Sequence, residues 1–215
     1  MGPPPNPATL TEKSYRRGIS DLGLQDAALA AVVSKWGNPP FWTHTPGFPG
    51  LVIGILSQQV SLESARATYT KLEEAIGSVR PEAFLSAGDE ALRAIGFSRQ
   101  KASYVRDLAH GIRVGDMDLA ALELVDDDQA RKRLMEWRGI GAWTADTYLL
   151  FAMRRADAWP SGDLALEKAV QEVKGLTKTP DSEEADRIAK QWRPLRAVAA
   201  RILWHHYLCE RGRLI

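Results

Sequence analysis

Apolar residues recur at helical spacing along most of the chain. The first such run begins near Asp21 and ends at Trp36, where a glycine, an asparagine and two prolines follow. Similar runs, separated by Gly, Pro, Asp and Ser turns, are predicted over residues 48–58, 61–76, 81–87, 89–95, 98–113, 118–122, 127–137, 143–153, 163–174 and 182–210. No segment alternates convincingly with period two. The pattern therefore predicts an all-α protein of about ten helices joined by short connections.

The N-terminal residues do not share this periodicity. Four prolines lie among residues 1–9, and proline fixes φ and removes an amide donor. We therefore expect residues 1–10 to form a disordered, proline-rich tail outside the fold.

The composition is that of a soluble globular chain. Its 215 residues are 45% hydrophobic, which is enough for a sizeable core in one or two small domains. Lys and Arg number 28 against 27 Asp and Glu, a formal net charge of +1. This balance argues against nucleic-acid binding by bulk electrostatics, but it leaves room for a locally basic face or for backbone amide donors.

The cysteine content limits the metal and disulfide chemistry. The one cysteine, Cys209, cannot form an intramolecular disulfide, a four-thiolate zinc site or a four-cysteine iron–sulfur cluster. No stretch approaches the roughly 18 apolar residues of a membrane span, and the N-terminus lacks the residue order of a signal peptide. We therefore expect a cytoplasmic protein in a reducing compartment, without a membrane partner.

Two segments carry mostly basic charges and are candidate phosphate-facing surfaces. Residues 98–113 hold four Lys and Arg side chains against one Asp, and all five charged side chains of residues 187–201 are basic. Taken alone, each segment is better interpreted as the solvated side of an amphipathic helix. The acidic residues 126–128 are interpreted in the same way as a helix cap rather than a metal site.

The segment 134–151 carries the most specific signal. Two predicted helices flank Gly139-Ile-Gly141, a turn expected to be too tight for side chains at both glycines. The second helix begins with amides that have no partner within the helix, and such amides suit a phosphate. For the glycines alone, an ordinary αα-hairpin is the better interpretation. The surrounding residues, Leu134 and Trp143-Thr-Ala145, shift the balance towards phosphate binding.

With these residues the chain resembles the helix-hairpin-helix DNA glycosylases, and within them the alkylpurine (3-methyladenine) glycosylases of the AlkA and Mag type. Further matching stretches are Ile55-Leu-Ser-Gln-Gln-Val-Ser61, Gly96-Phe-Ser-Arg-Gln-Lys-Ala102 with Tyr104-Val105, Trp159-Pro-Ser-Gly-Asp163, and Trp192-Arg-Pro-Leu-Arg196 with Leu203-Trp204. The resemblance covers about residues 20–210. It implies two helical subdomains with the active site in the cleft between them. One consists of residues 11–46 plus 159–215, and the other, residues 47–158, contains the hairpin at about 128–154.

The resemblance also implies the site residues. Asp163 takes the place of the family's catalytic aspartate, and Trp143 and Trp204 match aromatic positions of its base pocket. The family's hairpin binds DNA phosphates through main-chain amides and a monovalent cation, Na⁺ or K⁺. The implied DNA contacts are Gln58, Gln59, Ser61, Arg138, Gly139, Ile140, Gly141, Ala142 and Thr144, and the implied cation ligands are the main-chain oxygens of Met135, Trp137 and Ile140.

Several assignments stay open at this point. Asp163 precedes a predicted helix, so an N-cap is the simpler interpretation of that residue alone, and Asp146 is the nearest alternative carboxylate. Gln59 matches the position of the wedge that fills the gap left by a flipped base, with Gln58 as the alternative. The catalytic carboxylate could activate water or stabilise an oxocarbenium-like sugar. The remaining conspicuous tryptophans are interpreted as core residues: Trp36, Trp42, Trp137 and Trp192.

Departures from related enzymes narrow the expected function. The single cysteine excludes the branch with an iron–sulfur cluster, and no redox or organic cofactor is expected. Trp143 stands where strand-cleaving glycosylases carry a lysine, so the resemblance implies a monofunctional enzyme. The implied enzyme is a bacterial, nucleoid-associated monomer that acts in base-excision repair. It flips 3-methyladenine, 7-methylguanine and related lesions out of double-stranded DNA and hydrolyses their N-glycosidic bonds. The alternatives are a non-catalytic hairpin protein that binds DNA and a helical interaction protein without a nucleic-acid role.

Overall fold

The computed structural model of the chain describes residues 8–213 and confirms the all-α prediction. Over this range the chain forms thirteen α-helices and one 3-10 turn, and it has no strand beyond an isolated bridge between Thr9 and Arg155. No helix in the described range is long and apolar enough to cross a membrane.

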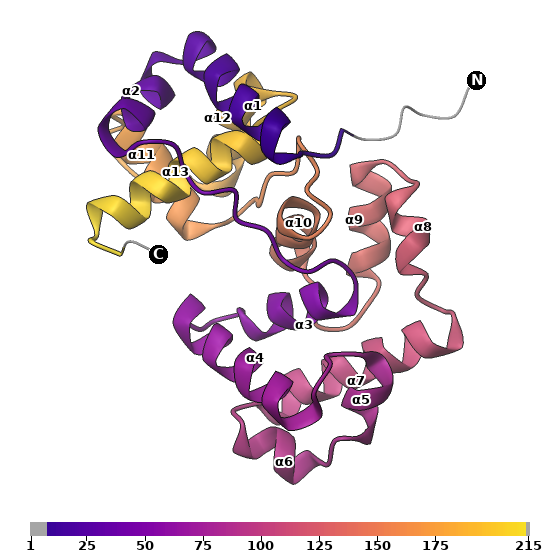
Figure 1. Cartoon of the computed structure of the whole chain (residues 1–215). Coiled ribbons are helices and arrows are strands. Elements are labelled where there is room, and N and C mark those ends of the chain that lie inside the picture. Colours follow the sequence, from indigo (N-terminus) through magenta and orange to yellow (C-terminus); the bar gives the residue numbers. More distant parts are fainter. Residues whose placement is uncertain (1–7, 214–215) are drawn as a thin grey trace, which may run out of the picture. The chain divides into compact units, whose positions relative to one another are not determined.

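The described residues divide into two compact units (Figure 1). The first, residues 44–148, contains α3 (Phe48–Leu56), α4 (Leu62–Ile76), α5 (Pro81–Ser86), α6 (Asp89–Ala94), α7 (Arg99–Val114), α8 (Leu119–Glu123), α9 (Asp127–Met135) and the start of α10 (Ala142–Phe151). The second, residues 8–43 and 149–213, contains α1 (Glu12–Gln25), α2 (Ala27–Trp36), the end of α10, α11 (Leu164–Lys174), α12 (Ser182–Ala189), the 3-10 turn η1 (Lys190–Trp192) and α13 (Arg196–Glu210).

The chain returns to the second unit earlier than the resemblance implied. That boundary was expected at residue 159, whereas the units divide after Tyr148. The intervening residues bond to α13: the Leu150 oxygen accepts from Arg201 at 2.9 Å, and the Ala156 oxygen accepts from the Ala197 amide at 3.0 Å. These bonds make the end of α10 and the segment after it part of the second unit.

In the first unit, α7 is the central helix. Helices α3, α5 and α6 pack against it, and α8 packs against α9 (Figure 1). Ser98 caps the start of α7 by accepting from the Lys101 amide at 3.2 Å, and Gly115 ends it in the left-handed conformation. Phe84 of α5 is fully buried and lies 5.5 Å, ring to ring, from Phe97. The amphipathic pattern of residues 98–113 therefore becomes the buried face on which this unit is built.

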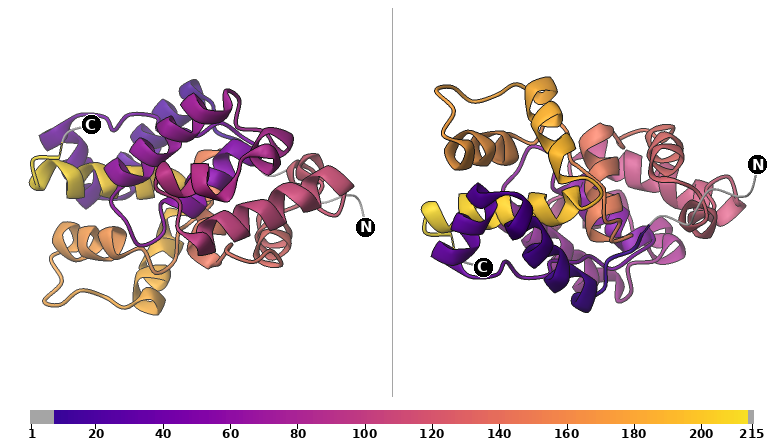
Figure 2. Two further views of the ribbon diagram at one scale, coloured as in Figure 1. Left: turned by 90° about the horizontal axis from the view of Figure 1, so that it is seen from below. Right: turned by 90° about the horizontal axis from the view of Figure 1, so that it is seen from above.

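In the second unit, α13 is the central helix. It lies between α1 and α2 on one side and α11 on the other (Figure 2). Ten of its residues are buried, which is the pattern of a helix surrounded by protein rather than by water on one side.

Two predicted helices are each broken in the structure. The run ending at Trp36 is two helices, α1 and α2, with Asp26 between them. Asp26 caps α2 by accepting from the Ala28 amide at 3.0 Å, and its carboxylate also accepts from Trp192 at 2.7 Å. The run 182–210 is interrupted by η1 and Pro194, because proline offers no amide to continue a helix.

Part of the predicted N-terminal tail belongs to the fold. Residues 1–7 lie outside the described residues, but residues 8–10 are part of the second unit. The Leu10 amide donates to the Arg154 oxygen at 2.7 Å, the Ala156 amide donates to the Ala8 oxygen at 2.8 Å, and the Leu10 side chain is buried. The expectation of disorder up to residue 10 was wrong because Leu10 fills a core position.

Candidate DNA-binding and active site

The hairpin of the first unit forms where the glycines indicated. Helix α9 begins at an Asp126 cap, which confirms the interpretation of the acidic residues as a cap, and it ends at Met135. The chain turns through residues 136–141, and the first bond of α10 runs from the Ala145 amide to the Gly141 oxygen at 3.0 Å. The amides of Ala142 and Thr144 therefore belong to the first helical turn, which has no carbonyl partners of its own helix.

The two glycines of the turn meet different constraints. Gly139 has φ +83°, and a Cβ atom there would lie 2.2 Å from the Tyr104 ring. Gly141 is exposed and lies outside the left-handed region, and a Cβ atom at this position would meet nothing within 4 Å. The expectation that both positions are too tight for a side chain is therefore wrong for Gly141. The open space beside Gly141 is where a phosphate could approach the first amides of α10.

Helix α7 packs against the hairpin turn. Tyr104 occupies the space under Gly139, and Trp137 occupies the space beside Gly111, where a Cβ atom would come within 1.8 Å of the indole. Arg138 lies over the Tyr104 ring and pairs with Asp107 at 3.1 Å. Trp137 is thus a packing residue, as expected, and the exposed Arg138 remains on the surface of the turn.

The two adjacent glutamines have different environments. The Gln58 amide nitrogen donates to the Gly139 oxygen at 2.7 Å and to the Thr144 hydroxyl at 2.9 Å, so this side chain belongs to the hairpin. Gln59 is exposed and has φ +57°, a conformation that non-glycine residues rarely adopt. Ser61 caps α4 by accepting from the Ser64 amide at 3.1 Å. Of the two glutamines, Gln59 is exposed, whereas Gln58 is half-buried and bonded to the hairpin.

The predicted cation ligands lie at the end of α9 and in the turn after it. Because α9 ends at Met135, the carbonyls of its last turn have no donor within the helix. The Trp137 oxygen accepts from the Ile140 amide at 3.1 Å and keeps a second lone pair. Carbonyl oxygens of this kind are ligands that monovalent cations take in proteins. The donor set therefore fits Na⁺ or K⁺, and the cation site stays a prediction.

Trp143 and Asp146 also belong to the first unit, on α10. Trp143 is half-buried in the first turn of the helix. Asp146 is buried and accepts from Arg131 of α9 at 2.8 Å. This ion pair ties α9 to α10 and gives the carboxylate of Asp146 a structural task.

In the second unit, Asp163 is held by two donors. It caps α11, since its Oδ1 accepts from the Leu166 amide at 2.9 Å, and the same oxygen accepts from the Trp204 indole at 3.2 Å. The N-cap interpretation is correct, and the structure also brings together the two residues of this unit that the resemblance assigned to catalysis and to the base pocket.

Trp204 has an aromatic neighbour on one face. Its ring stacks on Phe151 with centroids 5.3 Å apart and 18° between the planes. Phe151 in turn lies 5.3 Å from the guanidinium of the fully buried Arg201. Arg201 donates to the Trp42 oxygen at 3.0 Å, which fixes it further. The half-buried indole is therefore fixed by Phe151 on one face and by Asp163 at its nitrogen.

A carboxylate of α12 holds the loop that leads to Asp163. The two oxygens of Asp186 accept from the Trp159 indole at 2.9 Å and from the Ser161 hydroxyl at 2.8 Å. Residues 159–162 are thereby anchored just before the catalytic candidate. Asp186 was not identified from the sequence, because it reads as one polar position of an amphipathic helix.

A buried carboxyl group, that of Glu167, lies one helical turn after Asp163. Glu167 is only 8% exposed. Burial and the nearby charges of Asp163, Asp181 and Asp186 raise the pKa of Glu167. The folded state holds this proton more tightly than the unfolded chain does. The stability that the protonated Glu167 contributes is therefore present below the pKa of the unfolded chain and is lost as the pH rises through the raised pKa of the folded state.

We expect Glu167→Gln to raise the melting temperature at pH 7, because it removes a buried charge and keeps the shape. The difference should shrink as the pH falls, because wild-type Glu167 then takes up its proton and both side chains are neutral. Glu172→Gln on the same helix is the matched control of opposite sign, since Arg211 holds the pKa of Glu172 below its usual value. Thermal unfolding between pH 4 and 8 measures both, and a lower melting temperature of Glu167→Gln at pH 7 contradicts the assignment.

The two basic segments are not continuous phosphate-facing surfaces. In residues 98–113, Lys101 donates to main-chain oxygens of the first unit, and Arg106 pairs with Asp89 at 2.7 Å. In residues 187–201, Arg196 pairs with Asp157 at 2.9 Å and Arg201 is fully buried. Several of these cations therefore serve the fold.

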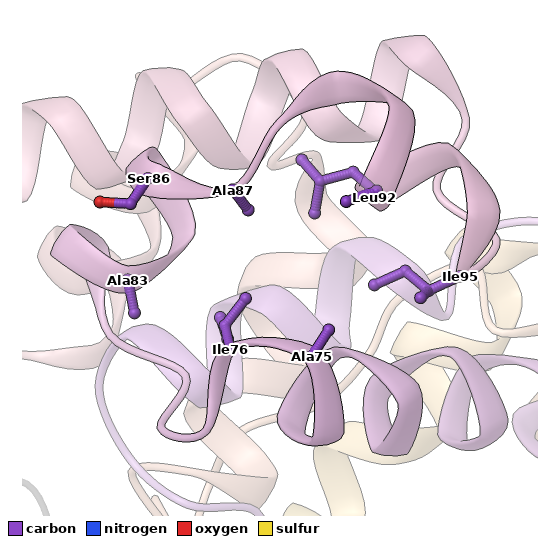
Figure 3. A pocket seen from close by; sticks show the side chains of 8 residues that line it. Ala75, Ile76, Ala83, Ser86, Ala87, Leu92 and Ile95 are labelled. Carbon is purple, nitrogen blue, oxygen red and sulfur yellow. The ribbon is translucent and has the colours of Figure 1, made fainter.

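Other features of the described residues do not add to the site. A cavity of about 320 Å³ in the first unit is lined by small and apolar side chains, with Ser86 as its one hydroxyl (Figure 3). That hydroxyl donates to the Glu82 oxygen at 3.0 Å, so the cavity has no polar group suited to catalysis. Between residues 8 and 213, no three His, Cys, Asp or Glu side chains are grouped so that they could hold a metal ion.

Comparison with known proteins identifies the family. Residues 52–194 match the HhH-GPD superfamily base excision DNA repair protein, a region that includes the hairpin, Asp163 and Asp186. The chain belongs to the HhH-GPD superfamily. The match covers more than half of the chain, in agreement with the resemblance seen in the sequence.

Individual HhH-GPD relatives are similar over most of the chain. The protein YfjP of Bacillus subtilis (strain 168) is 26% identical over 185 residues, which are 82% of this chain and 64% of YfjP. The alkylbase DNA glycosidase-like protein mag2 of Schizosaccharomyces pombe is 24% identical over 90% of this chain and 94% of its own. The crystal structure of a DNA-3-methyladenine glycosidase from Bacillus halodurans has a TM-score of 0.77 at 27% identity, covering 91% of each chain.

Proposed function

We propose that the protein is a DNA glycosylase that hydrolyses the N-glycosidic bond of alkylated purines in double-stranded DNA. The observation that carries the proposal is the bond between the Trp204 indole and Asp163, which joins a stacking surface to a carboxylate across 41 residues of sequence. A protein that only binds DNA needs no such pair. The superfamily and the names of mag2 and the Bacillus halodurans glycosidase support the same reaction.

The chemistry follows from the charge that develops on the sugar. Cleavage of an N-glycosidic bond passes through a deoxyribose with oxocarbenium character, which a carboxylate near the anomeric carbon stabilises. Asp163 supplies that carboxylate, and the Leu166 amide and the Trp204 indole hold it in one orientation before the substrate arrives. An alkylated purine already carries positive charge, so departure of the base needs no strong general acid.

The target base must leave the duplex before Asp163 can act. We assign Trp204 and Trp143 to recognition of the flipped base, because a cationic purine is attracted to the face of an indole. Gln59 is the wedge: it is exposed, whereas Gln58 is bonded to the hairpin. The unusual backbone conformation of Gln59 is of the kind found at functional sites.

The hairpin grips the backbone of the DNA. The first amides of α10, beside the open position at Gly141, bind a phosphate. The carbonyls of Met135, Trp137 and Ile140 would hold Na⁺ or K⁺, whose positive charge would add to the attraction for phosphate. Such contacts carry no sequence information and position the enzyme on any duplex. Trp143 occupies the place of the lysine that strand cleavage requires, so the reaction ends at an abasic site in an intact strand.

The proposal is tested by incubating the wild-type protein with methylated duplex DNA and analysing the products. We expect free 3-methyladenine and 7-methylguanine, with strand breaks appearing only after alkaline treatment. Strand breaks without alkali contradict the monofunctional assignment. Salt-dependent duplex binding without base release contradicts the enzyme and favours a non-catalytic binding protein.

A further inference from the structure

The turn that carries Gln59 is held on its N-terminal side by hydrogen bonds to other parts of the first unit. It follows the C-terminus of α3, where the last carbonyls of a helix lack intrahelical donors. The Lys101 ammonium of α7 donates to the Leu56 oxygen at the end of α3 at 2.7 Å and to the Gln58 oxygen in the turn at 2.8 Å. The main chain on the N-terminal side of Gln59 is therefore held by the half-buried Lys101 side chain of α7.

The second attachment leads directly to the hairpin. The single amide nitrogen of Gln58 donates both to the Gly139 oxygen in the turn and to the Thr144 hydroxyl at the start of α10. Thr144 is buried, and Gly139 is fixed against Tyr104, so both acceptors are rigid. One side chain thus connects the turn before Gln59 to both sides of the proposed phosphate-binding loop.

The strained backbone of Gln59 requires such attachments. A non-glycine residue at φ +57° is strained and persists only where its surroundings impose it. Gln59 is exposed and its neighbour Val60 is 44% exposed, so the C-terminal half of the turn is held by little packing. The backbone of Gln59 is constrained instead by the hydrogen bonds of the preceding residues: those of the Gln58 side chain to the hairpin, and those from Lys101 to the Leu56 and Gln58 oxygens.

We propose that Gln58 is a positioning residue that ties the wedge turn, residues 57–60, to the hairpin. When the hairpin binds a phosphate, the wedge turn is then held where Gln59 can enter the base stack. Lys101 holds the main chain of the same turn through the Leu56 and Gln58 oxygens. This inference rests on the proposed function. It adds that phosphate binding and base flipping are coupled through one glutamine side chain.

A double-mutant cycle tests the coupling. Gln59→Ala, which removes the wedge, and Gln58→Ala, which frees the turn, should each slow base release from a fully paired lesion by about tenfold or more. If Gln58 acts through Gln59, the double variant is no slower than the slower single variant, because the wedge is already absent. If Gln58 only stabilises the fold, the two losses multiply, and that result overturns the proposal.

A second substrate separates positioning from general damage. A lesion opposite an abasic site is already unpaired on one side, so it needs less help to leave the stack. Both glutamine variants should recover most of their rate on this substrate. A Gln58→Ala loss of equal size on both substrates contradicts the proposal.

Lys101→Met provides an independent variant that leaves the hairpin bonds in place. We expect the same pattern, a loss on the paired lesion that is not increased by Gln59→Ala, and Lys71→Met on the exposed side of α4 serves as its control. Multiplying losses for Lys101 and Gln59 count against the proposal. Wild-type protein that releases no base from either substrate instead refutes the proposed function itself.

Discussion

Asp163→Asn should lower the rate of base release by about 10²–10⁴-fold while leaving duplex binding intact or tighter. The asparagine oxygen can still accept from the Leu166 amide and from Trp204, and Asn is as good an N-cap as Asp. The substitution therefore removes the negative charge and keeps the architecture. Single-turnover release of methylated purines, measured together with binding to the same duplex, checks both parts.

A second capping aspartate of the same unit provides the control. Asp181 caps α12 by accepting from the Glu184 amide at 2.9 Å, in the same way that Asp163 caps α11. Asp181→Asn should leave base release unchanged. If Asp163→Asn retains turnover, the catalytic carboxylate lies elsewhere, and Asp146 is then the residue to replace.

The features predicted correctly from sequence depend on residues close together in the chain. The hairpin between α9 and α10 follows from two glycines between helical runs, and the Asp126 cap follows from an acidic residue before a helix. Asp163 and Trp204 were found only through the resemblance, because nothing local distinguishes Asp163 from an ordinary cap.

The features that were missed depend on contacts far apart in the chain. Asp26 breaks a run of helical residues because Trp192 and Lys174 hold its carboxylate, and neither partner can be identified from the sequence nearby. Lys101 and Asp186 read as polar positions of amphipathic helices, although each holds a loop of the candidate site. A charged residue on a helix gives no sequence signal of whether it faces water or a distant main chain.

The two hairpin glycines look alike in the sequence but differ in their packing, so their replacement should have different effects. The sequence treats Gly139 and Gly141 alike, but only Gly139 is required by packing. Gly139→Ala combines a left-handed backbone with a clash against Tyr104, so it should cost at least about 2 kcal/mol of unfolding free energy and lower the melting temperature. Its loss of DNA binding would then follow from damage to the turn.

Gly141→Leu should keep the fold and lose DNA binding, because its side chain fills open space beside the first amides of α10. Losing charge-assisted bonds from these amides to a phosphate should weaken binding by about 10–100-fold, by the same factor for damaged and undamaged duplexes. Gly88→Leu is the matched control: Gly88 also precedes a helix, has open space around it and lies outside the left-handed region. Unchanged duplex affinity of Gly141→Leu contradicts a role for the hairpin in binding, and a loss confined to damaged DNA moves this position from backbone gripping to recognition of the lesion.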